Sequence, residues 1–206
     1  MANQKLLLQL VRVGCGDETG GQYMEKLGKD EFYLSAVGVD ASNTVHKLDP
    51  IEIDSNFADG KIKEFSPPRT LLTLNVPEAG PFPKTCAVYF IGAERYDGKG
   101  HQEATTAAYT KANEQAVLAK AAAKADGGVT AAVAAAATAA VVAYVKEMVD
   151  KHFKDKVFPV QTNSLEVSTG NFIWPDGTKL SPETTVRFLG FEGKYHLDYF
   201  WEMQSV

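Results

Sequence analysis

The segment from Gly127 to Val145 reads GGVTAAVAAAATAAVVAYV and contains no charged residue, although the chain on either side of it alternates like β-strands. Alanine dominates the whole block 101–156, and alanine has the highest intrinsic helix propensity. Asp126, Gly127 and Gly128 interrupt this block near its middle, a composition typical of a turn. The sequence therefore predicts two helices joined by a glycine turn, inserted as a hairpin into a β-structure.

The flanking regions predict about eight strands, five before the helical block and three after it. Leu6–Val13 and Ala87–Ile91 are nearly continuous apolar runs, which suit strands covered on both faces. Residues 195–203 alternate with a period of two and present an almost wholly apolar face. Pro67 and Pro68 predict a break in strand structure between two of these runs.

Strands and helices do not alternate along the chain, so a Rossmann-like fold or a TIM barrel is not favoured. The fold class that we expect is mainly β with an α insertion, an antiparallel β-sandwich of about eight strands that carries the Ala-rich helical hairpin. The sandwich would consist of residues 1–100 and 157–206, and the inserted hairpin of residues 101–156. A chain of 206 residues is long enough to bury such a core without disulfide or metal staples.

Small residues repeat along one face of each expected helix, opposite a face that carries lysines and glutamates in the first helix. Because only methyl groups intervene, such a stripe lets another helix approach closely. We expect the two stripes to pack against one another on the sandwich. They consist of Ala104, Ala108, Ala112, Ala116, Ala119 and Ala123 in the first helix, and of Val129, Val133, Ala137, Ala140, Val141, Tyr144, Val145 and Met148 in the second.

The second expected helix is also a candidate for membrane contact. Residues 129–145 would extend for about 26 Å at 1.5 Å per residue, and a hydrocarbon layer is about 30 Å thick. Alanine and threonine gain little from lipid, so a standing transmembrane span is not favoured. Small-residue hairpins do pack well against one another in lipid. Conditional insertion or self-association, in the manner of a pore-forming toxin, therefore stays open beside permanent packing on the sandwich.

Acidic residues gather in loops that an antiparallel sandwich would bring to one edge. One pair follows the first strand, a second pair opens the next strand, and a third group follows Ala87–Ile91. Calcium binds six to eight oxygens from carboxylates and carbonyls, so these loops predict a calcium site; solvated loop tips are the alternative. The candidate ligands are Asp17, Glu18, Asp30, Glu31, Glu94 and Asp97.

With these loops and flanks the chain resembles the C2 family of β-sandwiches over its first 100 and last 50 residues. The resemblance implies calcium held between Asp17 and Asp30 of one loop and Glu94 and Asp97 of the other, with docking on lipid headgroups. The second loop, GAERYDGKG, lacks the Asp-x-Asp spacing typical of calcium-binding C2 domains. The arrangement DETGG…GKDEFYL also resembles the start of some uncharacterised bacterial proteins with Ala/Gly-rich insertions.

Composition and motifs disfavour several classes of function. The net charge is −5 and no basic patch is interleaved with aromatic residues, so nucleic-acid binding is not expected. The chain contains no HExxH, GxSxG, P-loop or GxGxxG motif, so neither an enzyme nor a small-molecule cofactor is indicated. His196 and Asp198 share one side of the last expected strand, and we interpret them as rim residues rather than a catalytic pair.

The two cysteines, Cys15 and Cys86, lie at the edges of strand-like runs, and we expect buried free thiols, with cross-strand pairing as the alternative. The apolar run Leu6–Val11 is broken by Gln9 and is too short for a secretory signal. A cytoplasmic location, or export without a cleavable signal peptide, is therefore expected.

The function expected from these features is that of a non-catalytic calcium-binding module. It would contact a membrane surface or other subunits through the Ala-rich hairpin. The alternative is a structural or assembly protein whose hairpin packs permanently and which binds no metal.

Overall fold

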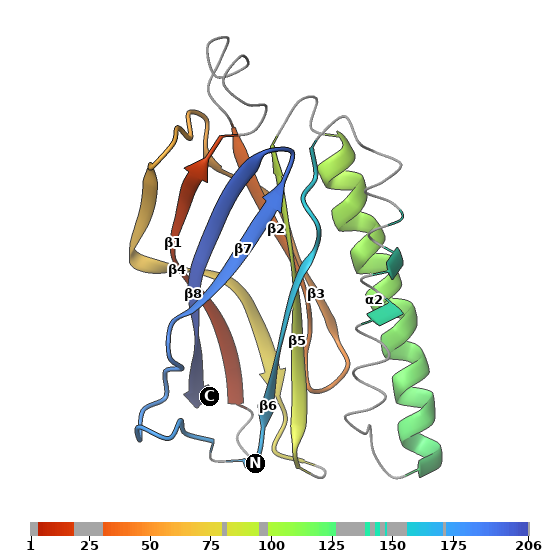
Figure 1. Ribbon diagram of the computed structural model, residues 1–206. Coiled ribbons are helices and arrows are strands. Elements are labelled where there is room, and N and C mark those ends of the chain that lie inside the picture. The colour runs from red at the N-terminus through yellow and green to blue at the C-terminus, as the bar shows by residue number, and fades with distance from the viewer. Residues whose placement is uncertain are drawn as a thin grey trace.

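The computed structural model describes residues 4–18, 31–79, 82–94, 99–126, 156–170 and 172–205, with five further residues between 139 and 147. Within these ranges the chain forms eight strands and one long helix (Figure 1). The predicted order, with five strands before the helical block and three after it, is confirmed. The elements are β1 (Gln4–Asp17), β2 (Phe32–Val39), β3 (Val45–Asp54), β4 (Ile62–Val76), β5 (Lys84–Glu94), α2 (Lys99–Asp126), β6 (Gln161–Val167), β7 (Thr184–Gly190) and β8 (Gly193–Ser205).

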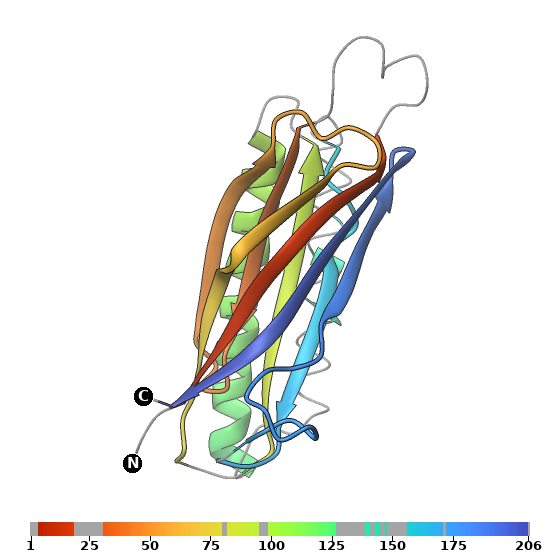
Figure 2. The same cartoon turned by 90° about the vertical axis from the view of Figure 1, so that its left-hand side faces the viewer.

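The strands form two antiparallel sheets. Sheet A has the order β4-β1-β8-β7 and sheet B the order β3-β2-β5-β6. The sheets face each other as two layers (Figure 2), and alternate side chains of both point into one shared core. The predicted antiparallel sandwich is therefore present.

Strand β4 runs through Pro67 and Pro68, where the sequence predicts a break. The strand tolerates them because it lies at the edge of sheet A, and because the β1–β4 register shifts between Leu10 and Arg12. Pro50 similarly lies in β3, an edge strand of sheet B. Proline is therefore accommodated at the β3 and β4 edges of the two sheets.

Phe32 ties the two sheets together at one end of the sandwich. Its ring lies 4.5 Å from that of Tyr195 on β8, with an angle of 17° between the planes. The rings of Phe57, Phe158 and Phe188 surround this stack at 5.8 to 6.2 Å from Phe32. Offset ring contacts of this kind stabilise a core beyond the area that they bury.

Helix α2 covers the outer face of sheet B (Figure 1). Ala104, Ala108, Ala112 and Ala116 are buried in one cluster with residues of β2, β3 and β5. The predicted alanine stripe is thus a packing surface, and among the described residues its neighbours in this cluster are the strands of sheet B and Val157. Methyl side chains let a helix lie close to a flat sheet as readily as to another helix. Most of the second predicted stripe lies outside the described residues, so its packing against the first stays a prediction.

The rest of the predicted hairpin is described only in part. Ala119 is buried, whereas the side chain of Ala123 lies outside the described residues. The predicted positions Val129, Val133, Ala137, Val141, Val145 and Met148 lie outside them too. Ala139, Ala140, Ala143, Tyr144 and Glu147 are helical, and the ammonium group of Lys111 on α2 lies 5.5 Å from the ring of Tyr144. In the part of the chain that is described, no helix is long and apolar enough to span a membrane.

The close fit of α2 on sheet B predicts a penalty for larger side chains. Ala108 is fully buried, so Ala108→Leu should lower the free energy of unfolding by about 1–3 kcal/mol through overpacking. Urea unfolding followed by circular dichroism measures the change. Val117 on the same helix is 66% exposed, and Val117→Leu should leave stability within about 0.5 kcal/mol of the parent. Equal effects of the two changes would contradict the observed orientation of α2.

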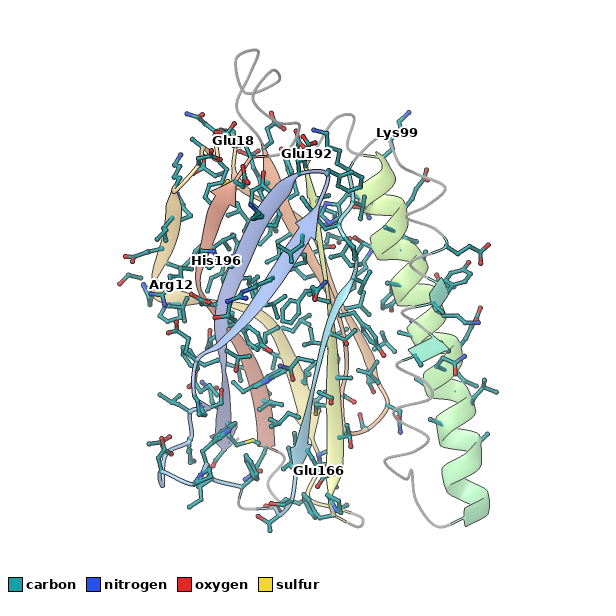
Figure 3. The ribbon with its side chains drawn as sticks, in the orientation of Figure 1. Arg12, Glu18, Lys99, Glu166, Glu192 and His196 are labelled. Atoms are coloured by element: carbon teal, nitrogen blue, oxygen red, sulfur yellow. The ribbon has the colours of Figure 1, made fainter. Side chains whose placement is uncertain are left out.

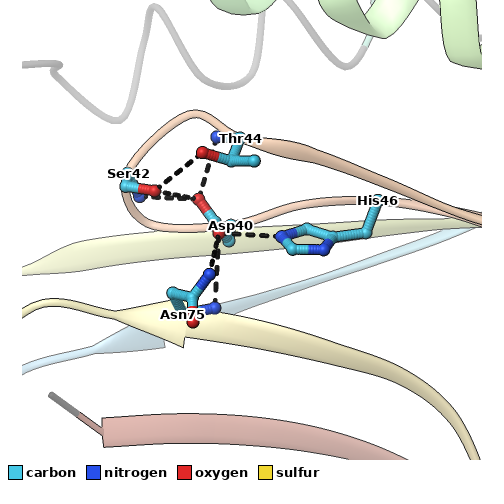
Figure 4. A network of polar contacts seen from close by, with 5 residues as sticks. All are labelled: Asp40, Ser42, Thr44, His46 and Asn75. Atoms are coloured by element: carbon cyan, nitrogen blue, oxygen red, sulfur yellow. Dashed lines mark hydrogen bonds and ion pairs between the residues drawn. The ribbon is translucent and has the colours of Figure 1, made fainter.

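A buried carboxylate joins the β2–β3 turn to the end of β4 (Figure 4). Asp40 Oδ1 accepts hydrogen bonds from the backbone and hydroxyl of Ser42 and from the backbone of Thr44. Its Oδ2 accepts from His46 Nε2 at 2.8 Å and from Asn75 Nδ2 at 3.1 Å. Burial by itself raises the pKa of Asp40, but the hydrogen bonds from Ser42, His46, Thr44 and Asn75 outweigh it and hold the pKa below its usual value. The ionised side chain therefore connects sheet B to sheet A.

Cys15 and Cys86 are buried thiols, as predicted, and the alternative of a disulfide between them is wrong. Burial raises the pKa of the Cys86 thiol to about 12, and the nearby charge of Asp40 acts in the same direction. Because the thiolate is the reactive form, Cys86 is chemically inert near neutral pH.

Candidate functional site

An open hollow lies on the outer face of sheet A, which α2 does not cover. Side chains of β1, β7 and β8 that alternate away from the core converge there. The hollow has a volume of about 520 Å³ and is lined by Gly16, Thr185, Arg187, Leu189, Lys194, Tyr195, His196 and Asp198. Figure 3 shows Arg12 and His196 on this face, where β1 and β8 run side by side.

Glycine on β1 makes room for the histidine of the hollow. Gly14 is the cross-strand partner of His196. A Cβ atom at position 14 would lie inside the van der Waals surface of the imidazole ring. The ring therefore lies directly over the backbone of β1, which only glycine permits here.

Arg187 and His196 are the groups of the hollow with spare binding capacity. They are cross-strand neighbours on β7 and β8. Arg187 is exposed and His196 half-buried, and neither side chain forms a hydrogen bond or ion pair with a described residue. An arginine presents five N–H donors in a planar fork that matches carboxylate and phosphate oxygens. The two side chains together can therefore receive an anionic group.

At the end of the hollow near Asp198, the charges of Asp198 and Arg12 are already balanced by ion pairs within the protein. Arg12 Nε donates to Asp198 Oδ2 at 2.6 Å, and Arg12 Nη2 lies 2.6 Å from Glu183 Oε1. The hydroxyl of Thr185 donates to Asp198 Oδ1 at 2.5 Å. Burial raises the pKa of Asp198, but the hydrogen bonds from Thr185 and Arg12 and the charge of Arg12 outweigh it, so the pKa is lowered. Asp198 is therefore a charged anchor for Arg12.

The opposite end of the hollow reaches the β7–β8 hairpin. Lys194 forms an ion pair with Asp17 at 2.7 Å, with the Lys194 side chain 63% exposed and that of Asp17 36% exposed. Leu189 is 56% exposed and adds an apolar rim beside these charges. Phe191 and Glu192 form the turn with positive φ angles of 54° and 68°, a backbone conformation that costs non-glycine residues about 1–2 kcal/mol each. Packing of Phe191 on Phe158, at 5.7 Å between ring centroids, offsets part of this strain.

The four predicted metal ligands that the structure describes, Asp17, Glu18, Glu31 and Glu94, lie at one end of the sandwich, and each contacts protein groups. β1 and β5 run in the same direction, so their C-terminal ends and the start of β2 lie at that end (Figures 1 and 2). Asp17 binds Lys194, as described above. The backbone N–H of Glu18 donates to Asp59 Oδ1 at 2.6 Å, and that of Asp59 donates to Glu18 Oε1 at 3.1 Å.

The remaining predicted ligands are divided between sheet B and undescribed segments. Glu94 forms an ion pair with Lys156 at 2.7 Å, and Glu31 accepts a hydrogen bond from the hydroxyl of Tyr33 at 3.3 Å. Asp30 and Asp97 lie outside the described residues. Among the residues that are described, no three His, Cys, Asp or Glu side chains are grouped so as to hold a metal ion.

A second polar cluster lies beneath α2, and the sequence gives no signal for it. Ser35 on β2, His101 and Thr105 are all buried, with Ser35 Oγ 2.9 Å from His101 Nε2 and 2.7 Å from Thr105 Oγ1. Ser35 lies within an otherwise apolar strand, and only the packing of the helix shows that it meets a histidine. The hollow, in contrast, has a detectable pattern, because T-x-R-x-L and K-x-H-x-D flank one tight turn.

His196 and Asp198 share the outer face of β8, as the sequence predicts, but no hydrogen bond joins them within the described structure. The carboxylate of Asp198 is directed instead to Arg12 and Thr185. Comparison with known proteins gives no assignment for either polar cluster. No protein-family model matches the chain, and no curated protein sequence matches it.

Proposed function

We propose that the protein is a non-catalytic binding module that recognises a phosphate or carboxylate group in the hollow on sheet A. The observation that carries this proposal is the pair Arg187 and His196, which lie side by side in a hollow without ion-pair partners among the described residues. The nearby Lys194 and Leu189 would favour an anion attached to a small apolar group. The paired charges of Arg12 and Asp198 would hold the floor of the site in place.

Arg187→Gln is expected to weaken the binding of inorganic phosphate about tenfold, because a charge-assisted hydrogen bond contributes about 1.5–3 kcal/mol. Phosphate titration followed by ¹H–¹⁵N NMR measures this affinity. In the unmodified protein, the amide signals of Gly14, Gly16, Arg187 and His196 should shift together as phosphate is added. Phenyl phosphate should bind more tightly than phosphate if the exposed Leu189 side chain contributes.

The matched control is Arg69→Gln, which removes the same charge from an exposed position of β4 outside the hollow. It should leave phosphate affinity unchanged. A similar loss in both variants would indicate a nonspecific effect of net charge. An absence of phosphate-dependent shifts around Gly14 and His196 would contradict the proposal and favour the structural or assembly role.

Calcium binding by the acidic loops and contact with membranes or subunits through residues 101–156 remain separate proposals. The contacts of Asp17 with Lys194 and of Glu94 with Lys156 would have to break before these carboxylates could bind calcium. A calcium arm in the NMR titration distinguishes the sites, since calcium would shift signals near Asp17 and Glu94 while phosphate would shift those near Arg187.

A further inference from the structure

The polar cluster beneath α2 connects the first turns of this helix to sheet B. His101 Nε2 lies 2.9 Å from Ser35 Oγ on β2 and 3.2 Å from the carbonyl oxygen of Ile91 on β5. The side chain of Thr105, one turn further along α2, reaches the same serine. The helix is therefore attached to both central strands of sheet B at one buried point.

The hydrogen positions follow from the donors and acceptors that are present. The hydroxyl of Thr105 donates to the carbonyl of His101 at 2.8 Å, so the hydroxyl of Ser35 donates to Thr105 Oγ1. Ser35 Oγ and the Ile91 carbonyl then both accept from His101 Nε2, which must carry the proton of the neutral ring. The hydrogen bonds of this cluster can therefore all form with an uncharged imidazole ring.

The surrounding interface tolerates a positive charge poorly. His101 is 3% exposed, and burial lowers its pKa from 6.5 to about 4, although the hydrogen bond to the Ile91 carbonyl acts in the opposite direction. The residue also lies near the N-terminus of α2, where the helix dipole disfavours a cation. Beyond this cluster, α2 packs on the sheet largely through alanine methyl groups, each of which buries little apolar area.

Other ionisable groups lie on the elements that surround the His101 ring. The hydroxyl of Tyr33 is hydrogen-bonded to the carboxylates of Glu31 and Glu52. Asp49 forms an ion pair with Lys47 and accepts a hydrogen bond from Gln102. Strand alternation and these contacts identify the titratable groups on the α2-facing side of sheet B and on α2 itself. They are Tyr33, Glu31, Lys47, Asp49, Glu52 and Tyr89 on or beside sheet B, and Lys99, Glu103 and Lys111 on α2.

We propose that protonation of His101 releases α2 from sheet B, so that the docking of this helix is an acid-sensitive switch. The direction follows from linkage. A histidine whose pKa is lowered in the docked state stabilises docking at a pH above 6.5, and this contribution is lost as the pH falls from there toward about 4. Release would uncover the alanine face of α2 and the apolar surface of β2 and β5 that it covers. This inference does not depend on the anion site of sheet A.

Hydrogen–deuterium exchange at pH 7.5 and pH 5 tests the switch, with rates corrected for the intrinsic effect of pH. The protection of α2 amides should fall about 30-fold between these pH values, as expected for a group whose pKa changes from 6.5 to about 4. Amides of β1 and β8 in sheet A should stay protected. In His101→Gln, which cannot gain the charge, the protection of α2 should not depend on pH.

His46→Gln is the matched control, since it removes another histidine while leaving the α2 contacts in place, and it should keep the 30-fold loss. If His101→Gln does not fold, an NMR titration of the His101 imidazole in the unmodified protein replaces it. The proposal is overturned if α2 protection is the same at both pH values, if it falls equally in His101→Gln, or if the imidazole titrates near 6.5 while α2 stays protected.

Discussion

Replacing Asp40 with alanine is expected to lower the free energy of unfolding by about 3 kcal/mol, because the donors around its carboxylate lose their acceptor. The backbone N–H groups of Ser42 and Thr44 and the side chain of Asn75 all depend on this one residue. The β2–β3 turn would then lose its attachment to the end of β4. Urea unfolding monitored by tryptophan fluorescence gives the magnitude.

The pH dependence of this effect follows from the lowered pKa of Asp40. The carboxylate stabilises the fold fully above its ordinary pKa of 3.8, and the contribution is lost as the pH falls through the lower value of the folded state. The difference between parent and Asp40→Ala should accordingly be constant above about pH 5 and shrink in stronger acid.

An exposed aspartate offers a comparison at a similar turn. Asp176 Oδ1 accepts hydrogen bonds from the backbone and hydroxyl of Thr178, both at 2.9 Å. Because Asp176 is exposed, water replaces its contacts, and Asp176→Ala should cost less than about 1 kcal/mol. Equal losses in the two variants would mean that Asp40 acts only within its own turn and does not connect the sheets.

Phe32→Ala should be at least as damaging, with an expected loss of about 3–5 kcal/mol for a buried phenylalanine. The side chain is fully buried and contacts four aromatic rings, of which Phe188 and Tyr195 belong to sheet A and Phe57 and Phe158 to segments between strands. Its removal also leaves Tyr195 without its stacking partner. Since Tyr195 precedes His196 on β8, the NMR signals of the hollow should shift in this variant even where the protein remains folded.

Phe32→Leu separates ring stacking from cavity formation, because it keeps most of the volume and should cost less than about 2 kcal/mol. Ile173→Ala, at a position that is 55% exposed, should change stability by no more than about 0.5 kcal/mol. If Phe32→Ala resembled Ile173→Ala, the aromatic cluster would not be what joins the sheets at this end.

Much of the fold follows from local pattern. The apolar alternation in the flanks and the alanine composition of the middle predict the strand order and the first helix, because strand period and helix propensity are properties of neighbouring residues. Two details depend on position in the sheet instead. Proline is tolerated in β4 because that strand is at an edge, and the alanine stripe packs on sheet B because that face is open to it.

The candidate sites could be predicted less well, since each is built from segments far apart in the sequence. The hollow needs Gly14 of β1 beside His196 of β8, and the cluster under α2 needs Ser35 beside His101. The described carboxylates Asp17, Glu18, Glu31 and Glu94 lie at one end of the sandwich, as the strand directions predict. These carboxylates are engaged by partners such as Lys194 and Lys156, which no spacing rule for metal ligands takes into account.

The positions of the prolines also give the sandwich two unlike sides. β3 and β4 form one pair of sheet edges and carry Pro50, Pro67 and Pro68. β6 and β7 form the other pair and contain no proline. A residue without an N–H group cannot complete a ladder of hydrogen bonds with an incoming strand. Among the described strands, the β3 and β4 edges are therefore less suited to pairing with an additional strand than the β6 and β7 edges.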